Sequence, residues 1–356
     1  MPEQRICIPH SWELADSPAL REQVYSFRHR HYFNQLPEAQ WLDHDRMRVY
    51  APHDDHSVHL VARNAEGKMI AAGTGTRADS DDLPEEWAHM LHLERLKPLG
   101  LSKILIYSRL VELPECRGTP LFLHFFKYAA RLFTDRGFGY TIHYSPPANV
   151  SMYERLGYRT YSGGFTLSSS LYRIPMILVA ADAAYLARVH PAFSEAIRGL
   201  VPAGNSEAAY TLLPELHAVP LAARSAPEAL AHVRGLCRSG NAGQTIPERA
   251  ARLINRATLL RLRKGDAPIH TSDKPLLWFV LSGACEVKPK DGGSQTASAG
   301  YGINAHSGCS FITLEDADVL IFGNHAPFDD MESVMPAPRF WQALLAAKKR
   351  KSSSAT

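Results

Sequence analysis

The stretch from residue 104 to residue 158 constrains the fold of this chain more than any other part of its sequence. It opens with the apolar run ILIYSRLVEL, a buried strand by pattern, which stops at Pro114 and turns at Arg117 and Gly118. A helical segment (120–135) and a second apolar strand (140–144) follow. A strand, a turn, a helix and a returning strand predict a βαβ unit. The start of its helix, where free backbone N–H groups point outward, is a ready site for a phosphate-bearing ligand.

The segments on either side of this unit predict the rest of a sheet. We expect a helix at 19–36, hairpin strands at 57–64 and 69–77, a helix at 81–96, a short helix near Asn149, strands at 165–171 and 173–180, and a helix at 182–200. Antiparallel strands come first and a parallel unit follows. The order therefore predicts an α/β fold, a mixed sheet flanked by helices on both faces.

The composition is that of a globular protein. The 356 residues suffice for two domains, and hydrophobic and charged contents of 45% and 21% are ordinary. A net charge of +3 gives no reason to expect nucleic acid as a partner. No apolar run has the length of a signal peptide or of a membrane-spanning helix. The five cysteines are scattered without metal-type spacing, so we expect reduced thiols in a cytoplasmic protein and no metal site.

The pattern changes after the segment VPAGNS at 201–206, which is typical of a linker. Helical patterns fill 207–257. Short strands separated by Gly, Asp, Ser and Pro then indicate a small β-barrel or β-roll, and a closing helix is expected at 338–349; the strands are expected at 259–263, 276–281, 284–288 and 319–322. We therefore predict two domains, 1–204 and 205–356.

The first domain carries the run SRLVELPECRG, a helix after it, and N-x-x-x-YERLGY at 149–158. In this series it resembles the GNAT acyltransferase superfamily. The runs VYSFRHRHYFNQL, DDHSVHLVARN and GTGTR resemble more narrowly the branch of acyl-homoserine-lactone synthases, N-acyl amino acid synthases and ornithine-lipid acyltransferases. This likeness covers residues 17 to about 180. It implies an amide-forming enzyme that passes an acyl group from a pantetheine thioester directly to an amine.

The resemblance implies a role for several residues. Tyr153 matches a tyrosine that protonates the departing thiolate, and its alternative is a core tyrosine on an amphipathic helix. Glu112 is the candidate base for the amine, and its alternative is an exposed strand carboxylate. The donor arm is expected to lie between the strands ending at Leu113 and Tyr144, where backbone groups of Val111 and Leu113 would pair with its amides as with an added strand. Further contacts to the donor are expected from Arg117, Gly118, Thr119, Leu121 and Asn149.

Two residues depart from the superfamily's phosphate loop. Coenzyme A-dependent members carry R/Q-x-x-G-x-G/A, whose small residues let backbone amides close around pyrophosphate. Here Pro120 removes one N–H donor and Phe122 stands in the place of a small residue. The resemblance therefore favours acyl carrier protein as the bearer of the acyl group, with acyl-CoA second. No tightly bound cofactor is expected.

The acceptor is expected to be a small amine, an amino acid or a related molecule. Ile106 holds the place of a glutamate that homoserine-lactone synthases have before their Ser-Arg pair, which favours the acyl amino acid or lipid branch. A set of polar residues falls where that branch keeps a polar cluster: Arg28, Tyr32, Asp54, Arg77, Ser108 and Arg109. They hold the acceptor's carboxylate or order the loop around it, or they form a structural ion-pair network.

The run from 260 to 292 resembles the cyclic-nucleotide-binding β-roll, with Leu281-Ser282-Gly283 in its strand-end motif. That family holds a cyclic phosphate with an arginine, and the corresponding stretch, 299–322, contains none. We therefore expect a degenerate roll that serves as a scaffold, a dimer surface or a dock for carrier protein. Two other functions stay open: a ligand-regulated protein lysine acyltransferase, and a pseudoenzyme that only binds carrier protein.

Overall fold

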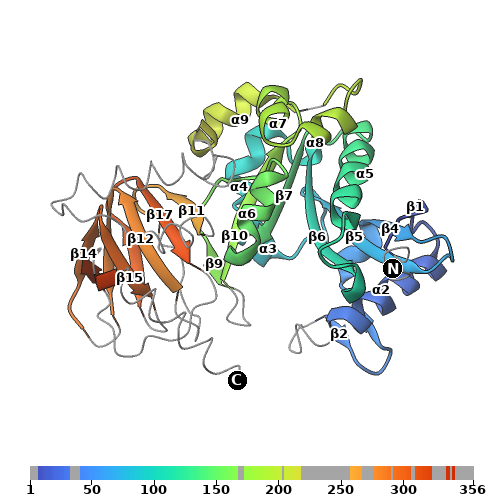
Figure 1. The fold of residues 1–356 in the computed structure, drawn as a ribbon, viewed down its shortest axis with the longest axis horizontal. Helices are drawn as coiled ribbons and strands as arrows, with labels where there is room; N and C mark the ends of the chain where they lie inside the picture. The colour runs from blue at the N-terminus through green and yellow to red at the C-terminus, as the bar shows by residue number, and fades with distance from the viewer. Residues whose placement is uncertain are drawn as a thin grey trace. The chain divides into compact units, whose positions relative to one another are not determined.

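The computed structural model describes residues 7–32, 41–166, 172–202, 204–217, 257–266, 276–289, 292–305, 309–322, 334–336 and 339–340 (Figure 1). The chain forms two compact units. Unit 1 contains Met1–His143 and Ile177–Leu212, and unit 2 contains Tyr144–Met176 and Leu213–Thr356. Residues 144–176 thus belong with the C-terminal part of the chain. The domain boundary near residue 204 stays a prediction.

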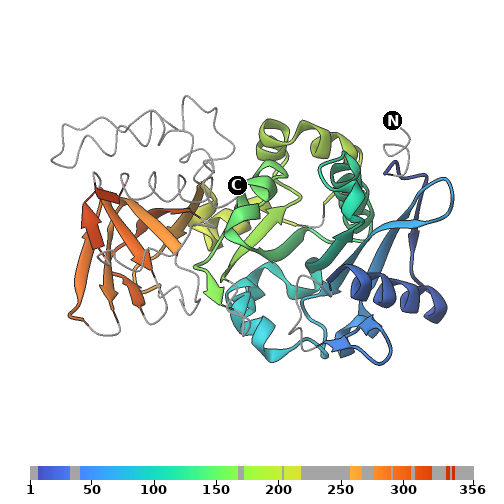
Figure 2. The ribbon, with the colours of Figure 1, turned by 60° about the horizontal axis from the view of Figure 1, so that its bottom comes forward.

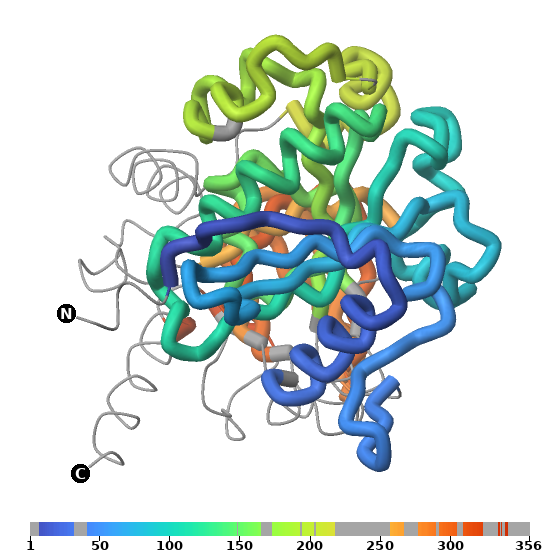
Figure 3. The backbone as a smooth tube through the Cα atoms, turned by 90° about the vertical axis from the view of Figure 1, so that its right-hand side faces the viewer, coloured from blue at the N-terminus to red at the C-terminus, as the bar shows by residue number. Residues whose placement is uncertain are grey.

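The largest sheet has eight strands in the order β1-β4-β5-β6-β7-β10-β8, with β9 paired to β10. Its strands are β1 (Ser11–Leu14), β4 (Val58–Arg63), β5 (Met69–Arg77), β6 (Ile104–Glu112), β7 (Tyr140–Ser145), β8 (Arg159–Thr160), β9 (Phe165–Thr166) and β10 (Tyr172–Val179). Strands β1, β4, β5 and β6 are antiparallel neighbours, whereas β6 and β7 are parallel. Figure 3 shows β1 running beside the β4–β5 hairpin. The predicted α/β class, a mixed sheet flanked by helices, is confirmed.

Two helices of unit 1 cover opposite faces of this sheet (Figure 2). Helix α2 (Pro18–Tyr32) packs on the face that carries Thr74, and α5 (Leu121–Asp135) packs on the face of Gly73, the preceding residue of β5. A Cβ atom on Gly73 would lie 2.9 Å from the Phe125 ring and 2.6 Å from the Tyr107 hydroxyl. Glycine at this position therefore lets α5 lie close against the sheet.

Two segments predicted as single helices are each divided, so those predictions are wrong in detail. The first consists of α3 (Glu85–Met90) and α4 (Leu93–Leu96), because His92 between them has a left-handed backbone with φ of 49°. The second consists of α7 (Ala183–Val189) and α8 (Pro191–Ala196). Here the proline disfavours a helical backbone at the residue before it. Helix α9 (Ser206–Leu212) and the 3-10 turn η5 (Pro214–His217) follow.

The C-terminal part of unit 2 is β-rich, as the sequence predicts. It contains a five-stranded sheet, β11-β17-β12-β15-β18, and a three-stranded sheet, β14-β13-β16. The strands are β11 (Thr258–Leu262), β12 (Leu276–Ser282), β13 (Ala284–Lys288), β14 (Gln295–Ser298), β15 (Tyr301–Ala305), β16 (Ser310–Thr313), β17 (Ala317–Phe322) and β18 (Val334–Pro336). Trp278 of one sheet meets Phe311 of the other, with ring centroids 4.6 Å apart. These strands are called the roll below.

Some sequence predictions fall on residues outside those that the structure describes. They are the end of the first helix (33–36), most of the helical stretch after His217, and nearly all of the closing helix at 338–349. In the described part of the chain, no helix is long and apolar enough to cross a membrane.

Candidate active site

The parallel pairing of β6 with β7 covers only the first part of β6. Ile104 pairs with Tyr140 and Ile106 with Ile142, and among the described residues the two strands pair no further. Strand β6 nevertheless continues to Glu112 and stays paired with β5 on its other side. Beyond Ile106, one backbone edge of β6 is thus left without a partner strand. An extended ligand can add to such an edge through main-chain hydrogen bonds.

The backbone groups that face this open edge differ from those predicted. The N–H of Leu113 donates to the carbonyl oxygen of Ile70 at 3.0 Å, so it faces β5. Backbone groups of successive residues face alternate edges of a strand, so Val111 also faces β5 and Glu112 faces the open edge. The prediction that Val111 and Leu113 supply the backbone contacts is corrected: the N–H and C=O of Glu112 are the groups in position.

The Glu112 side chain is half-buried in this strand. Burial raises the pKa of its carboxyl, and the Arg117 charge opposes this shift. A carboxylate with a raised pKa is a stronger base at neutral pH than an exposed glutamate. The pKa of Glu112 is thus shifted in the direction that a general base requires.

The turn between β6 and α5 uses several of its own N–H groups. Gly118 has a left-handed backbone, with φ of 77°, and Pro120 stands just before the helix without an N–H to offer. Internal bonds run from Arg117 N to Pro114 O (3.2 Å), from Thr119 N to Cys116 O (3.2 Å) and from Leu121 N to Thr119 Oγ1 (3.3 Å). These donors are not available to a pyrophosphate, which needs several of them at such a turn.

Basic side chains gather near the same turn. Lys68 pairs with Glu115 at 3.3 Å, and Arg30 and Arg117 are exposed. Burial and the Arg30 charge lower the pKa of His31, and the charges of Arg117 and Lys68 act in the same direction against that of Glu115. Arg30, Lys68 and Arg117 outnumber the nearby carboxyl groups of Glu112 and Glu115, which leaves an excess of positive charge. Such a surface attracts an anionic ligand or partner.

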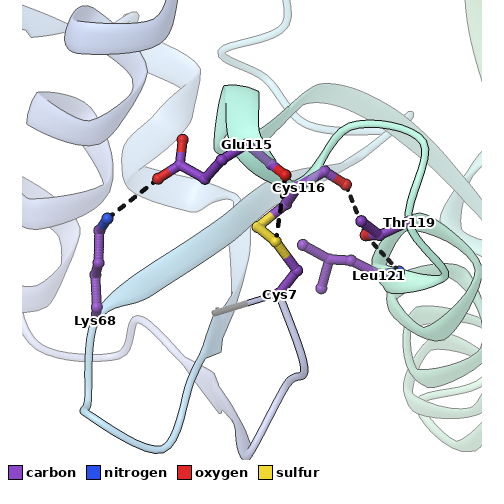
Figure 4. Close-up of a disulfide and its surroundings, with 6 residues drawn as sticks. All are labelled: Cys7, Lys68, Glu115, Cys116, Thr119 and Leu121. Atoms are coloured by element: carbon purple, nitrogen blue, oxygen red, sulfur yellow. Dashed lines mark hydrogen bonds and ion pairs between the residues drawn. A yellow bond between two sulfur atoms is a disulfide. The ribbon is translucent and has the colours of Figure 1, made fainter. Parts of the chain in front are cut away.

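A disulfide also lies at this turn. Cys7, near the N-terminus, is bonded to Cys116, and the backbone carbonyl of Glu115 lies beside the two sulfur atoms (Figure 4). The expectation that all five cysteines are reduced is therefore wrong for this pair. Cys285 is a free thiol, and both Cys285 and Cys309 are buried. The sequence offered no sign of the bond, because 109 residues separate its two ends.

A buried group of charges, the Asp54 cluster, lies on the α2 face of the sheet. Asp54 accepts from Arg28 at 3.1 Å and from Arg109 at 2.5 Å, and both Asp54 and Arg28 have fully buried side chains. Burial would raise the pKa of Asp54, but the two guanidinium groups lower it to about 2. We define the cluster as these three residues with His53, His59 and Thr74.

The cluster lies over a row of three residues on neighbouring strands of the sheet. His59 of β4 lies opposite Thr74 of β5, and Thr74 lies opposite Ser108 of β6. Arg28 of α2 contacts His59 Nδ1 at 3.0 Å and donates to the Thr74 hydroxyl. The pairing of β5 with β6 shifts between Ala72 and Thr74.

Arg109 follows Ser108 at this irregularity and has a left-handed φ of 51°. Its Nη1 binds Asp54, and its other terminal nitrogen, Nη2, lies 3.3 Å from His53 Nε2.

The charges of the cluster do not cancel. Burial lowers the pKa of His53 and of His59 to about 4. The Arg109 charge adds to this shift for His53, and the Arg28 charge does so for His59. Both imidazoles are therefore neutral at pH 7. Two guanidinium groups and one carboxylate then leave a charge of +1. Such a buried charge favours an anion, for example a carboxylate.

Three buried polar atoms near the cluster have no hydrogen-bond partner among the described residues. They are the Tyr25 hydroxyl, His53 Nδ1 and Ser108 Oγ. Arg28 lies over the Tyr25 ring, 5.5 Å from its centroid, and Arg109 contacts His53. Buried polar atoms are normally paired, so unpaired ones close to an uncompensated charge are typical of a site for a small polar ligand.

The structure joins some of the predicted acceptor residues and separates others. Arg28, Asp54 and Arg109 are in direct contact, and Ser108 lies in the same row. Arg77 is not with them: it pairs with Asp79 at 2.6 Å, with more than half of its side chain exposed. Tyr32 ends α2, and its side chain lies outside the described residues.

Sequence reasoning missed His53, His59 and Thr74. The available signals were a histidine inside the apolar strand SVHLVAR and threonines alternating with glycines in GTGTR.

The predicted proton donor belongs to unit 2. Tyr153 lies on α6 (Pro147–Arg155), half-buried, with its ring against Tyr158 at a centroid distance of 5.8 Å. Asn149, one turn earlier on the same helix, is exposed. The part of the chain that the structure describes holds no group of three or more His, Cys, Asp or Glu side chains arranged for a metal ion.

Comparisons with known proteins give similarity to solved structures only. No family model matches the chain, and no curated protein matches it. One similar structure is BjaI, a CoA-dependent acyl-homoserine lactone synthase, with SAM and isopentyl-CoA; it is 14% identical with a TM-score of 0.41, over 53% of this chain and 90% of that one. Another is FeeM, an N-acyl amino acid synthase from uncultured soil microbes, 14% identical with a TM-score of 0.38, over 52% and 98%. TofI, in a ternary complex with an inhibitor and MTA, is 18% identical with a TM-score of 0.41, over 54% and 98%. Every TM-score lies below 0.5, so the function proposed below rests on the geometry of the site.

Proposed function

We propose that this protein is an amide-forming N-acyltransferase that moves an acyl group from a pantetheine thioester to the amine of an amino acid or related small molecule. The observation that carries the proposal is the open backbone edge of β6, which leads from Ile106 to Glu112 and then to the start of α5. The amides of a pantetheine arm can pair with this edge as an added strand. The phosphate of the arm then meets the N-terminus of α5 and the cations around it.

Acyl carrier protein is the donor that these features favour, with acyl-CoA second. A carrier protein presents one phosphodiester, whereas coenzyme A presents a pyrophosphate and a nucleotide. The turn before α5 has engaged the N–H groups of Arg117, Thr119 and Leu121 in its own bonds. The positive charge of Arg30, Lys68 and Arg117 suits a phosphodiester and an acidic protein surface.

The reaction needs one base and one acid. The amine nitrogen attacks the thioester carbonyl, a C–N bond forms, and the C–S bond then breaks. Glu112 takes the proton that the amine loses, directly or through water. Tyr153, in the role that the sequence resemblance implies, gives its proton to the leaving thiolate and regains one from solvent.

The Asp54 cluster is the proposed site for the carboxylate of the acceptor. Its charge of +1 suits an acceptor that carries an anionic group beside its amine, as do Ser108 Oγ and His53 Nδ1, which have no partner within the described part of the chain. The alternative that the sequence left open, a structural ion-pair network, has the same contacts. The two differ in what an Arg109 variant does to the acceptor's KM: a binding role raises this KM, whereas a structural network leaves it unchanged.

The test is an intact-mass assay with acyl carrier protein and coenzyme A donors of several chain lengths and a panel of amino acids. We expect amide product from the acyl carrier protein. Tyr153→Phe should lower the rate by about 10²-fold, because one positioned proton donor is lost. Tyr158→Phe, the same change within the same motif, is the matched control and should stay within about twofold of the parent protein.

Two outcomes would replace the proposal. Normal donor binding without amide product for any amine would indicate a protein that only binds carrier protein. Acyl groups transferred to protein lysines in preference to free amino acids would indicate a protein acyltransferase.

A further inference from the structure

The helix that carries Tyr153 is packed against the roll. Within unit 2, α6 contacts both β11 and β17, although both strands lie far from it in the sequence. The roll has no assigned part in the proposed reaction. Its contacts with α6 point to such a part.

The first contact lies at the start of α6. Thr258, the first residue of β11, is 1% exposed, and its hydroxyl donates to the carbonyl oxygen of Pro147 at 2.7 Å. Pro147 is the first residue of α6. A buried hydroxyl with one well-placed acceptor fixes the distance between the two elements at this end.

The second contact lies just after α6. Arg159, only 2% exposed, donates through Nη1 to the carbonyl oxygen of Leu216 in η5 at 3.1 Å. Glu215, the neighbour of Leu216, pairs with Arg263 at 2.7 Å. Arg263 directly follows β11. The far end of β11 is therefore connected, through η5, to the residue that follows Tyr158.

We propose that β11 fixes the position of α6 through the contacts at its two ends, an arrangement called the splint below. We also propose that Thr258 is a positioning residue for Tyr153 in the proposed acyl transfer. The two ends of the strand secure the two ends of the segment 147–159, which contains Tyr153 and Asn149. A proton donor works only within hydrogen-bond reach of its target, and a shift of about 1 Å can cost about 10²-fold in rate. The inference rests on the proposed function only where it concerns the rate; the splint itself is a property of unit 2.

The experiment compares three variants of the full chain. Thr258→Val removes the hydroxyl and keeps the shape, Thr258→Ser keeps the hydroxyl, and Thr296→Val makes the first change at an exposed position of β14. Hydrogen exchange is measured at the amides of 151–155. We expect exchange about fivefold to tenfold faster in Thr258→Val, because one buried hydrogen bond is lost. Both other variants should exchange at the parent rate.

The turnover of the same variants gives the second readout. In Thr258→Val, kcat should fall about tenfold while the donor's KM changes less than twofold, and Thr258→Ser should recover most of the loss. Should Thr258→Val fail to fold, Glu215→Gln tests the other end, with faster exchange expected at 158–160.

The outcomes separate the two proposals. Exchange in Thr258→Val equal to that in Thr296→Val would overturn the splint, whatever the activity. Faster exchange without a change in kcat, in a parent protein that does transfer acyl groups, would overturn the positioning role. A parent protein with no acyl transfer at all would refute the proposed function, while the exchange data would still decide on the splint.

Discussion

Arg109 combines an unfavourable backbone with a favourable charge contact. A left-handed backbone costs a residue other than glycine about 1–2 kcal/mol, and Arg109 has φ of 51°. The contact that accompanies this cost is its 2.5 Å ion pair with the buried Asp54. Strained residues that are held in place by their surroundings gather at functional sites. The side chain is also the least buried of the three charges, with 10% exposed, so it is the one that a ligand from solvent would meet first.

Arg109→Gln tests whether this charge binds the acceptor. We expect the acceptor's KM to rise at least tenfold, because a charge-assisted contact to the carboxylate is lost, while the donor's KM is unchanged. Arg77→Gln is the matched control, since Arg77 lies on the neighbouring strand and pairs with Asp79 at the surface. Steady-state kinetics with acyl carrier protein would measure both. Loss of thermal stability in Arg109→Gln with an unchanged acceptor KM would instead favour a structural ion-pair network.

The role of Glu112 as the base predicts how activity depends on pH. A base acts in its deprotonated form, so activity should rise with pH through the pKa of Glu112. Burial raises that pKa, which places the rise above the range of an exposed glutamate. Glu112→Gln should remove this rise and lower the plateau by about 10²-fold. The ionisation of the acceptor amine affects both proteins equally and cancels in their ratio. A ratio of parent to variant kcat/KM that stays constant with pH would exclude Glu112 as the base.

At the scale of elements, the disulfide ties the N-terminal segment to the turn between β6 and α5. It closes a loop with a sequence separation of 109 residues, and native disulfides typically add about 2–4 kcal/mol to the free energy of unfolding. We therefore expect the denaturant midpoint to fall on reduction. Cys7→Ser should show the lower midpoint with or without reductant. Reaction of all five cysteines with a thiol reagent, in unfolded protein that was never reduced, would show that the bond is absent.

The elements with strong local signals are those that the sequence predicts well. Residues 120–135 and 140–144 are found as α5 and β7 because apolar periodicity and the flanking turns agree. The position of the open edge beyond Ile106 could be predicted from the sequence, but the backbone groups that face it could not. Their direction depends on the register with β5. His59 and Thr74 were missed because their partner, Arg28, comes from a helix far away in the sequence. Arg28 itself looked like one charge among several on a cationic helix, and only packing shows that it is fully buried.

At the scale of the whole molecule, the two units do not follow the chain in order. Unit 2 takes residues 144–176 from the middle of the chain and joins them to the roll. The buried contacts of Thr258 and Arg159 belong to this joined unit. The roll thus helps to support the YERLGY segment, whatever ligand the roll does or does not bind. Its likeness to cyclic-nucleotide-binding rolls stays a prediction.

This organisation predicts how the protein behaves when it is cut at the boundary near residue 204. A fragment of residues 1–204 lacks β11 and η5, so the Pro147 carbonyl loses its bond from Thr258 and the buried Arg159 side chain loses its bond to Leu216, at about 0.5–3 kcal/mol each. We expect the fragment to be cleaved rapidly by protease within 144–176 and to transfer no acyl group. Co-expression with residues 205–356 should restore protection, because the missing partners are supplied by the second fragment. A 1–204 fragment that resists protease in this segment as well as the full chain does would show that the segment is stable without the roll, and that the simpler two-domain division is the right one.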